Sequence, residues 1–232
     1  MTPGAPARPP AADRFVREAG RLAPVPGVAE IRLHLAGDVL GLWQRTEDEF
    51  GPGQPPPFWA FAWPGGQALA RYVLDHPGLV AGRRVLDLGS GSGLVAIAAA
   101  LAGASTVLAS EIDPLAVAAI GLNARANAVP PPTVLGDVLD GDVPDGDGVD
   151  GGGAGAEVVL AADVWYARPL ADRVLGFIER ARARGACVLV GDIGRAFLPR
   201  DRFRVLDTRD IPVLADLEDA TFKRTMVLTP AW

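Results

Sequence analysis

The sequence predicts an α/β fold, a doubly wound, Rossmann-like parallel sheet with helices on both faces. Two observations support this prediction. From Arg84 onward, short apolar strand patterns alternate with helical patterns, as in successive βαβ units. The first of these strands leads directly into a glycine-rich run, Gly89 to Gly93, that opens a helix. Of the 232 residues, 49% are apolar, which is enough for a sizeable core.

The chain length suits one domain with an elaborated N-terminus. We place an N-terminal extension at residues 1–56 and the sheet-forming domain at residues 57–232. Residues 1–12 are rich in proline and alanine, so we expect them to be disordered.

The individual elements follow from apolar periodicity and from glycine and proline boundaries. Helices are expected at residues 13–22, 65–76, 94–101, 114–127 and 169–184. Strands are expected at residues 29–35, 84–88, 106–110, 133–135, 157–161, 186–190, 211–214 and 225–229. Alternation in the first of these strands places His34 on its exposed face, and Asp113 can cap the helix that begins at Pro114.

Composition argues against several classes of protein. The net charge of −6 disfavours general nucleic-acid binding, which needs a basic surface. The most apolar run, Leu94 to Ala102, is half the length of a membrane span. The N-terminus has no apolar signal core, so a cytoplasmic protein is expected. The single cysteine, Cys187, excludes an internal disulfide, and no cluster of metal ligands is evident.

The glycine-rich run indicates the kind of cofactor. Gly89, Gly91 and Gly93 permit a tight turn and close approach of a ligand to the free N–H groups of a helix start. A dinucleotide site would need its third glycine where Leu94 stands. Asp87, in the strand just ahead, suits an ammonium group better than a pyrophosphate. These features together favour S-adenosylmethionine, which has an amino-acid tail and no phosphate.

Two further acidic residues stand at strand ends. Glu111 follows the second strand of the series, where a carboxylate can accept hydrogen bonds from both ribose hydroxyls. Asp137 follows the third strand and could accept a hydrogen bond from the exocyclic adenine amine. With the glycine run, these residues form a predicted nucleoside site at one edge of the sheet.

Several motifs resemble those of a known family. Asp87 to Gly93 and Ser110 to Pro114 are similar to the first two motifs of class I, seven-strand methyltransferases. The aromatic run from Pro57 to Tyr72, together with Asp163-Val-Trp-Tyr166, resembles methyltransferase family 16. Within that family the resemblance is to lysine methyltransferases of the electron transfer flavoprotein β subunit. The arginine-rich and glycine-rich composition of this chain is typical of a bacterial branch of the family.

The resemblance implies a monomer and a seven-stranded sheet whose last strand runs antiparallel. It implies that Trp63, Gln67 and Ile112 belong to the cofactor site, and that Asp163 and Tyr166 face the target nitrogen. In this interpretation Asp163 accepts a hydrogen bond from the acceptor amine and Tyr166 orients it. An aromatic wall for a methylated ammonium would come from the tryptophans that flank these motifs, Trp59 or Trp165.

Other interpretations of the same residues stay open. Asp163 to Tyr166 could merely cap the following helix, and the tryptophans could be core. Residues 137–163 contain eight acidic residues and no basic ones, which fits either a rim that steers a basic target or a flexible solvated loop, most mobile over residues 140–155. The acceptor could be a protein lysine or a small amine or other metabolite. A cofactor-binding protein without catalysis is a third possibility.

Overall fold

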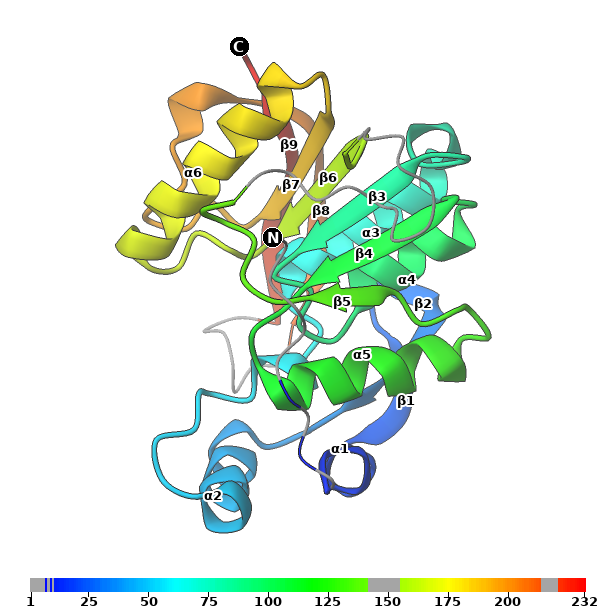
Figure 1. Cartoon of the computed structure of the whole chain (residues 1–232), viewed down its shortest axis with the longest axis vertical. Coiled ribbons are helices and arrows are strands. Elements are labelled where there is room, and N and C mark those ends of the chain that lie inside the picture. Colours follow the sequence, from blue (N-terminus) through cyan, green and yellow to red (C-terminus); the bar gives the residue numbers. More distant parts are fainter. Residues whose placement is uncertain (1–6, 8, 10, 142–154, 214–220) are drawn as a thin grey trace.

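The structure is a computed structural model that describes residues 7, 9, 11–141, 155–213 and 221–232. Its described residues form a seven-stranded sheet in the order β5-β4-β3-β6-β7-β9-β8 (Figure 1). The strands are β3 (Arg84–Leu88), β4 (Thr106–Ser110), β5 (Thr133–Leu135), β6 (Val158–Ala162), β7 (Cys187–Asp192), β8 (Phe203–Pro212) and β9 (Phe222–Pro230). The predicted doubly wound α/β class is therefore confirmed.

The order of the strands reverses at the centre of the sheet. β3 pairs in parallel with β4 on one side and with β6 on the other. β9 pairs antiparallel with both β7 and β8, so the last strand runs antiparallel as the resemblance implies. Doubly wound sheets bind ligands outside the carboxyl ends of their strands at such a reversal. The fold therefore places the candidate site beyond the ends of β3 and β6.

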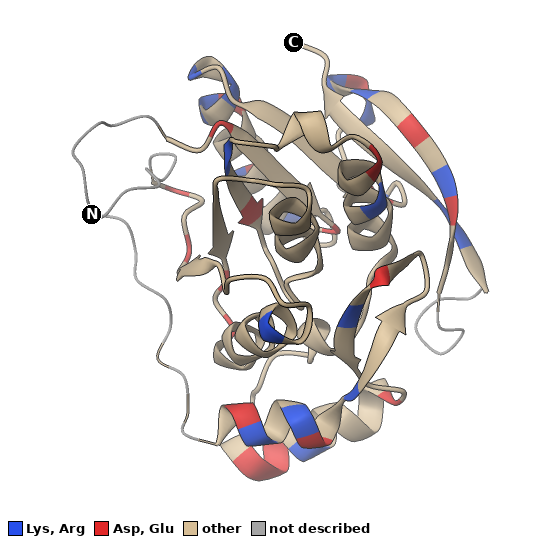
Figure 2. Cartoon of the chain, turned by 90° about the vertical axis from the view of Figure 1, so that its right-hand side faces the viewer, with Lys and Arg blue, Asp and Glu red and all other residues tan. Residues whose placement is uncertain are grey.

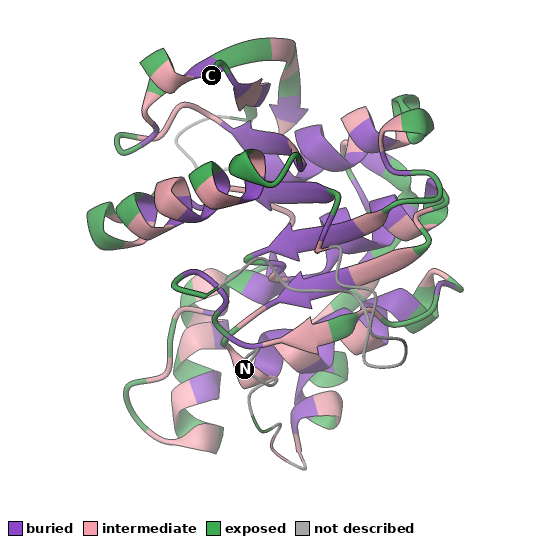
Figure 3. Cartoon of the chain, turned by 45° about the horizontal axis from the view of Figure 1, so that its top comes forward, coloured by how far each residue is buried: buried purple, intermediate pink, exposed green. Residues whose placement is uncertain are grey.

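Helices cover both faces of the sheet. They are α3 (Pro64–Asp75), α4 (Leu94–Leu101), α5 (Pro114–Ala126) and α6 (Arg168–Ala183), with single 3₁₀ turns at Phe58–Ala60, Pro77–Leu79 and Arg200–Arg202. α3 and α4 share one apolar core with the sheet, and α6 closes the opposite core. Figure 3 shows the buried residues concentrated in the strands between these layers. No helix of the described chain is both long and apolar enough to cross a membrane.

The N-terminal extension is more structured than the sequence predicts. It contains α1 (Ala12–Ala19), β1 (Arg21–Val25), β2 (Val28–Leu35) and α2 (Val39–Phe50). The helix predicted over residues 13–22 ends early because β1 pairs with β2, and that hairpin outweighs local helix propensity. The helix α2 was missed, although Asp38 caps it by accepting a hydrogen bond from Gly41 N at 3.0 Å.

The predicted disordered segment, residues 1–12, lies largely outside the described residues. Its last residue is described, and there the prediction is wrong. Ala12 is fully buried and begins α1, which packs against α5. The first helix therefore begins at Ala12, one residue earlier than predicted.

The C-terminal hairpin is longer than its sequence pattern suggests. The strand predicted at residues 211–214 is the end of β8, which begins at Phe203 and forms the edge of the sheet. Four of the ten residues of this edge strand are charged, Arg204, Asp207, Arg209 and Asp210, and a register shift between Val205 and Asp207 breaks the apolar period. Figure 2 shows charges gathered on this hairpin and on peripheral helices, whereas the central strands carry few.

His34 is buried, contrary to the exposed position predicted for it, because α5 covers that side of β2. Asn123 of α5 makes this contact. Its Oδ1 accepts a hydrogen bond from His34 N at 2.9 Å and lies 2.8 Å from His34 Nδ1. Its Nδ2 donates to Ser92 O in the glycine-rich run at 2.8 Å. One buried amide thus ties the N-terminal extension to the cofactor loop.

We predict that Asn123→Ala destabilises the chain by about 2 to 4 kcal/mol, because it leaves buried backbone groups of His34 and Ser92 without partners. Urea unfolding followed by circular dichroism measures this free energy. Arg125→Ala is the matched control on the same helix: its exposed ion pair with Asp13 is worth no more than about 1 kcal/mol. Equal losses in the two variants would contradict the proposed role of Asn123.

Candidate active site

The predicted site residues come together at one edge of the sheet. The glycine run follows β3, Glu111 follows β4, Asp137 follows β5 and Asp163 follows β6. These strands are parallel neighbours, so their carboxyl ends open onto one side. The first turn of α3, with Gly66 and Gln67, closes the Asp163 end of this row, because Gly66 N donates to the Asp163 carboxylate.

All three glycines of the loop adopt left-handed backbone angles. The φ values are 67° at Gly89, 54° at Gly91 and 83° at Gly93. Residues other than glycine rarely adopt φ values in this region. A Cβ on Gly91 would stand in open space, with its nearest neighbour, Gly89 O, 4.0 Å away. The loop therefore forms a cradle at the start of α4 that any side chain at Gly91 would partly fill.

Asp87 lies beneath this cradle and is only 2% exposed. Its Oδ2 accepts hydrogen bonds from Ser90 Oγ at 2.6 Å and from Ala96 N at 3.0 Å. Burial raises the pKa of Asp87 to about 6, although these two hydrogen bonds oppose the rise. Asp87 therefore fixes the loop against α4, and its predicted contact with the ammonium of the cofactor stays a prediction.

Glu111 reaches from the end of β4 toward the loop. Its Oε2 accepts a hydrogen bond from Gly91 N at 2.8 Å, and its Oε1 accepts from Ile112 N at 2.7 Å and Asp113 N at 3.0 Å. A carboxylate has about four acceptor positions, so one position remains on Oε2. A ribose hydroxyl can take that position, and a second hydroxyl would replace the Gly91 N–H.

Ile112 and Asp137 stand on either side of this nucleoside region. Ile112 is 67% exposed, which is unusual for a large apolar residue and leaves its side chain available to a flat aromatic base. Asp137 accepts a hydrogen bond from Leu139 N at 3.0 Å and pairs with Arg173 of α6 at 2.8 Å. Arg173 was not found from the sequence, and it neutralises part of the predicted acidic rim.

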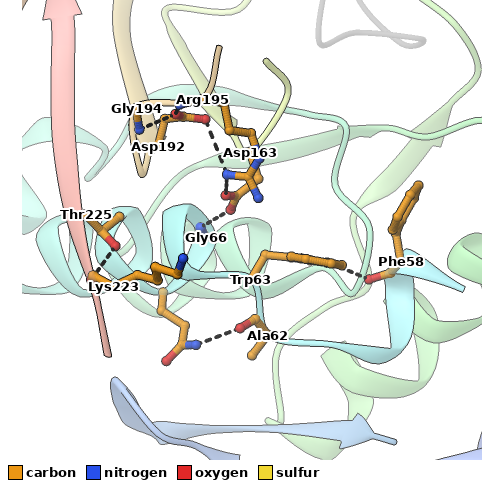
Figure 4. A network of polar contacts seen from close by, with 11 residues as sticks. Phe58, Ala62, Trp63, Gly66, Asp163, Asp192, Gly194, Arg195, Lys223 and Thr225 are labelled. Atoms are coloured by element: carbon orange, nitrogen blue, oxygen red, sulfur yellow. Dashed lines mark hydrogen bonds and ion pairs between the residues drawn. The ribbon is translucent and has the colours of Figure 1, made fainter. Parts of the chain in front are cut away.

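Asp163 is the most constrained acidic residue of the site. Its φ of 57° is left-handed, a conformation that aspartate tolerates better than most residues and that often marks functional positions. Its Oδ2 accepts a hydrogen bond from Gly66 N at 2.8 Å, and its Oδ1 accepts from Arg195 Nη1 at 2.6 Å. Burial raises its pKa to about 6, and the charge of Arg195 opposes that rise. Figure 4 shows this network between β6, β7 and α3.

Arg195 is a site residue that sequence reasoning missed. It follows β7, which neighbours β6, and its side chain is 15% exposed beside Asp163. Asp192, at the end of β7, holds the turn by accepting hydrogen bonds from Gly194 N at 2.6 Å and Arg195 N at 2.7 Å. The sequence does contain a signal for this pair, because Asp192 and Arg195 closely follow the strand predicted at residues 186–190. Only the order of strands in the sheet shows that they lie next to Asp163.

Gln67 is buried and fully engaged in hydrogen bonds. Its Oε1 accepts from Gly27 N at 2.8 Å, while its Nε2 donates to Ala62 O at 2.6 Å and Pro212 O at 3.3 Å. With Trp63 it lines an apolar pocket of about 150 Å³ between α3 and the N-terminal hairpin. The structure thus gives Gln67 a role in joining three segments, and its predicted contact with the cofactor stays a prediction.

The two tryptophans predicted to form an aromatic wall, Trp59 and Trp165, are core residues. Trp59 and Trp165 are at most 1% exposed and belong to separate apolar cores, so neither reaches the edge of the sheet. The accessible ring is that of Tyr166, 53% exposed, with its centroid 5.7 Å from that of Phe58. Phe58 in turn contacts Trp63, with 5.7 Å between ring centroids. The aromatic run from Pro57 to Tyr72 includes Phe58 and Trp63, but its sequence pattern could not show which of its rings face outward.

The hydroxyl of Tyr166 lies in a partly buried, negatively charged environment. Partial burial raises its pKa, and the negative charge of Glu111 raises it further. Both effects favour the protonated hydroxyl, which can donate a hydrogen bond.

The acidic segment gives no test of its predicted behaviour. Residues 142–154, which make up most of the segment expected to be mobile, lie outside the described residues. At its described start, Asp140 pairs with Arg173 at 2.7 Å. Both interpretations of this segment therefore stay predictions.

Comparison with known proteins bears directly on this site. A sequence profile of the ribosomal protein L11 methyltransferase (PrmA) family matches residues 68–179. The electron transfer flavoprotein beta subunit lysine methyltransferase of Danio rerio is 42% identical over 169 residues, or 72% of this chain and 61% of that protein. The Homo sapiens protein of the same name is 38% identical over 185 residues, or 78% of this chain and 63% of that protein.

Solved structures share the fold. Magnesium protoporphyrin IX methyltransferase from Synechocystis PCC 6803, solved with bound S-adenosylmethionine, superposes with a TM-score of 0.50 and 17% identity, covering 82% of this chain and 91% of that one. The chain is similar in sequence to these lysine methyltransferases over most of its length, and it shares the fold of a solved S-adenosylmethionine-dependent methyltransferase. These similarities agree with the cofactor predicted from the glycine run. The chain spans about three fifths of the length of the lysine methyltransferases it matches.

The residues of this site fit S-adenosylmethionine. The open cradle at Gly91 suits the amino-acid tail, the remaining acceptor position on Glu111 suits a ribose hydroxyl, and exposed Ile112 suits the adenine. The charged side chain beneath the loop is that of Asp87, and its negative charge disfavours a phosphate at this position.

We predict that Glu111→Ala weakens binding of S-adenosylmethionine or its demethylated product by about 1.5 to 3 kcal/mol, the range for hydrogen bonds to a charged group. Isothermal titration calorimetry gives this value directly. Glu179→Ala, which removes an exposed partner of Arg202 on α6, serves as the control and should leave affinity unchanged. An unaltered affinity in Glu111→Ala would remove Glu111 from the nucleoside site.

Proposed function

We propose that this methyltransferase transfers the methyl group of S-adenosylmethionine to a lysine side chain of a protein, the electron transfer flavoprotein β subunit or a similar protein. The observation that supports this acceptor is the constrained Asp163 carboxylate at the end of β6, beside the glycine loop of β3. The names of its relatives point to the same substrate.

The chemistry makes two demands on the protein. S-adenosylmethionine supplies a methyl group that is already activated on a sulfonium, so the protein chiefly positions the partners and excludes water. A lysine amine has an ordinary pKa of about 10.4 and must attack in its neutral form. The site must therefore favour loss of a proton from the amine and also stabilise the positive charge that returns to nitrogen as the bond forms.

Asp163 is suited to the second demand. Gly66 N and Arg195 Nη1 occupy two of its acceptor positions, which leaves positions for the hydrogens of an amine. Arg195 keeps the buried carboxylate ionised, and Gly66 fixes its direction. Arg195 also partly neutralises Asp163, which lowers its attraction for a protonated lysine relative to a neutral one. The exposed ring of Tyr166 borders the place where the amine would lie.

A small-molecule acceptor is the second candidate. The apolar pocket beside Trp63 and Gln67 favours it, because a pocket of about 150 Å³ can hold a small organic group but not a folded partner.

The two candidates differ in where the methyl group appears. Incubating the chain with radiolabelled S-adenosylmethionine and purified electron transfer flavoprotein, then digesting and sequencing by mass spectrometry, tests the first. Label on a β-subunit lysine supports it, and label found only among the small molecules of a lysate favours the second.

Four expectations from the sequence accompany this proposal. We propose a monomeric, cytoplasmic, bacterial enzyme that does not bind nucleic acid generally. The net charge of −6 supports the last of these expectations. Size-exclusion chromatography with light scattering tests the first of them, and a single protomer mass is the expected result.

We predict that Asp163→Asn lowers kcat for lysine methylation at least 10²-fold while cofactor affinity changes little, because it removes a charge felt mainly in the transition state. Asn is the informative variant because it keeps the shape and tolerates the left-handed φ, whereas Asp163→Ala adds backbone strain. Tyr166→Phe should cost less than Asp163→Asn, since only a hydroxyl is removed. Full activity in Asp163→Asn, by mass spectrometry of the acceptor, would exclude Asp163 from the reaction.

The raised pKa of Asp163 predicts a particular pH profile. Below the amine pKa, the logarithm of kcat/KM should rise with pH at a slope of one as the lysine loses its proton. Below about pH 6 the slope should approach two, because Asp163 must also be ionised. In Asp163→Asn the steeper limb should disappear. Its persistence in that variant would assign the titration to another carboxylate such as Asp87, whose pKa is also about 6.

A further inference from the structure

We propose that the chain methylates its own Lys223, the only lysine of its sequence. This inference rests on the proposed lysine methyltransferase function and extends it to an acceptor within the same chain. It depends on three features of Lys223: its position along β9, the face of the sheet to which its side chain points, and the contacts of α3 that join its surroundings to Asp163.

Lys223 stands at the active-site edge of the sheet. β9 runs antiparallel to β7, so β9 begins at the edge where the parallel strands end. Lys223 is the second residue of β9 and pairs with Ile211 of β8. The residue after Ile211 is Pro212, whose carbonyl accepts a hydrogen bond from Gln67 Nε2 at 3.3 Å. The neighbouring residue pair of the hairpin, Pro212 and Phe222, therefore contacts the first turns of α3 through Pro212, and Lys223 lies next to that pair.

Its side chain points to the face of the sheet that α3 covers. Residues two apart in a strand share a face, so Lys223 shares one with Thr225 and Val227. Both are fully buried, and Val227 belongs to the apolar core that contains Leu69 of α3. The neighbours of Lys223 in sequence, Phe222 and Arg224, are exposed, whereas Lys223 itself is half-buried.

The same turns of α3 bind Asp163. Gly66 N donates to Asp163 Oδ2, and the next residue, Gln67, makes the contact with Pro212 beside Lys223. In Figure 4 the Lys223 side chain extends from β9 toward Trp63 and the start of α3. The amine on which the proposed chemistry acts and the carboxylate that would hold it therefore flank one helix start.

The step is the same as for an external lysine. The neutral Nζ of Lys223 attacks the methyl carbon of S-adenosylmethionine, so an N–C bond forms and the C–S bond breaks. The electron pair of that bond stays on sulfur, which leaves as the thioether S-adenosylhomocysteine. The single proton released to solvent is the one that the ammonium of Lys223 loses before the attack, and the methylated product carries the positive charge. The charge of Lys223 is therefore kept, and methylation changes the size of the group and its capacity to donate hydrogen bonds.

The test compares the chain with a variant in which two neighbours are exchanged. Purified chain is incubated with radiolabelled S-adenosylmethionine alone, and the label is located by peptide mass spectrometry, which separates Lys223 from the N-terminal amine. The double variant Lys223→Arg with Arg224→Lys keeps composition, mass and charge but moves the lysine to the exposed neighbouring position. We expect methylation at Lys223 in the natural chain and at least a tenfold loss of label in the exchanged variant.

Three outcomes decide the proposal. Equal label in the exchanged variant, or no label at Lys223, would overturn it. A rate per chain that rises in proportion to protein concentration would assign the transfer to a second copy and overturn the intramolecular proposal. A parallel reaction with electron transfer flavoprotein separates this result from the proposed function: label on the flavoprotein without label on Lys223 contradicts only the inference, whereas label on neither contradicts the proposed function itself.

Discussion

The backbone of α3 touches the backbone of β7 at Gly65 and Gly191, and the acceptor half of the site is built on this contact. A Cβ on Gly191 would stand 2.8 Å from the carbonyl carbon of Gly65, and a Cβ on Gly65 would stand 2.6 Å from Asp163 Oδ2. Neither distance is compatible with a side chain, so only glycine at both positions lets the helix start approach so closely. This close approach brings Gly66 N within hydrogen-bond reach of the Asp163 carboxylate. The hydrogen bond holds the side chain of Asp163, whose backbone has a left-handed φ.

The cofactor half depends on a second set of backbone contacts. Glu111 fixes the glycine loop through Gly91 N, and Asp87 fixes the same loop to α4 through Ser90 and Ala96. Two acidic residues thus organise the loop from opposite sides before any ligand binds. Preformed geometry of this kind lowers the entropic cost of holding donor and acceptor in line. Tyr166 follows Asp163 in sequence, and the negative charge of Glu111 helps to raise the pKa of its hydroxyl.

Much of this architecture could be predicted from the sequence, because the strands of a parallel sheet are buried on both faces and leave strong apolar patterns. The glycine run and Glu111 were found because each directly follows such a strand, whereas Asp163 was found through the resemblance of its motif to a known family. Arg195 and Arg173 were missed because their partners lie far away in sequence and only the order of the sheet brings them together. The tryptophans were misassigned because an aromatic run does not reveal which rings are core, and tertiary pairing at β1 outweighed the helical propensity of residues 13–22.

The account makes one central claim, that a single edge of the sheet holds the methyl donor with its sulfur turned toward Asp163. A crystal structure with S-adenosylhomocysteine tests it most directly. We predict ribose hydroxyls on Glu111, the adenine beside Ile112, the amino-acid tail over Gly91, and the sulfur facing the gap between Asp163 and Tyr166. A nucleoside bound elsewhere, or a sulfur turned away from β6, would contradict the account.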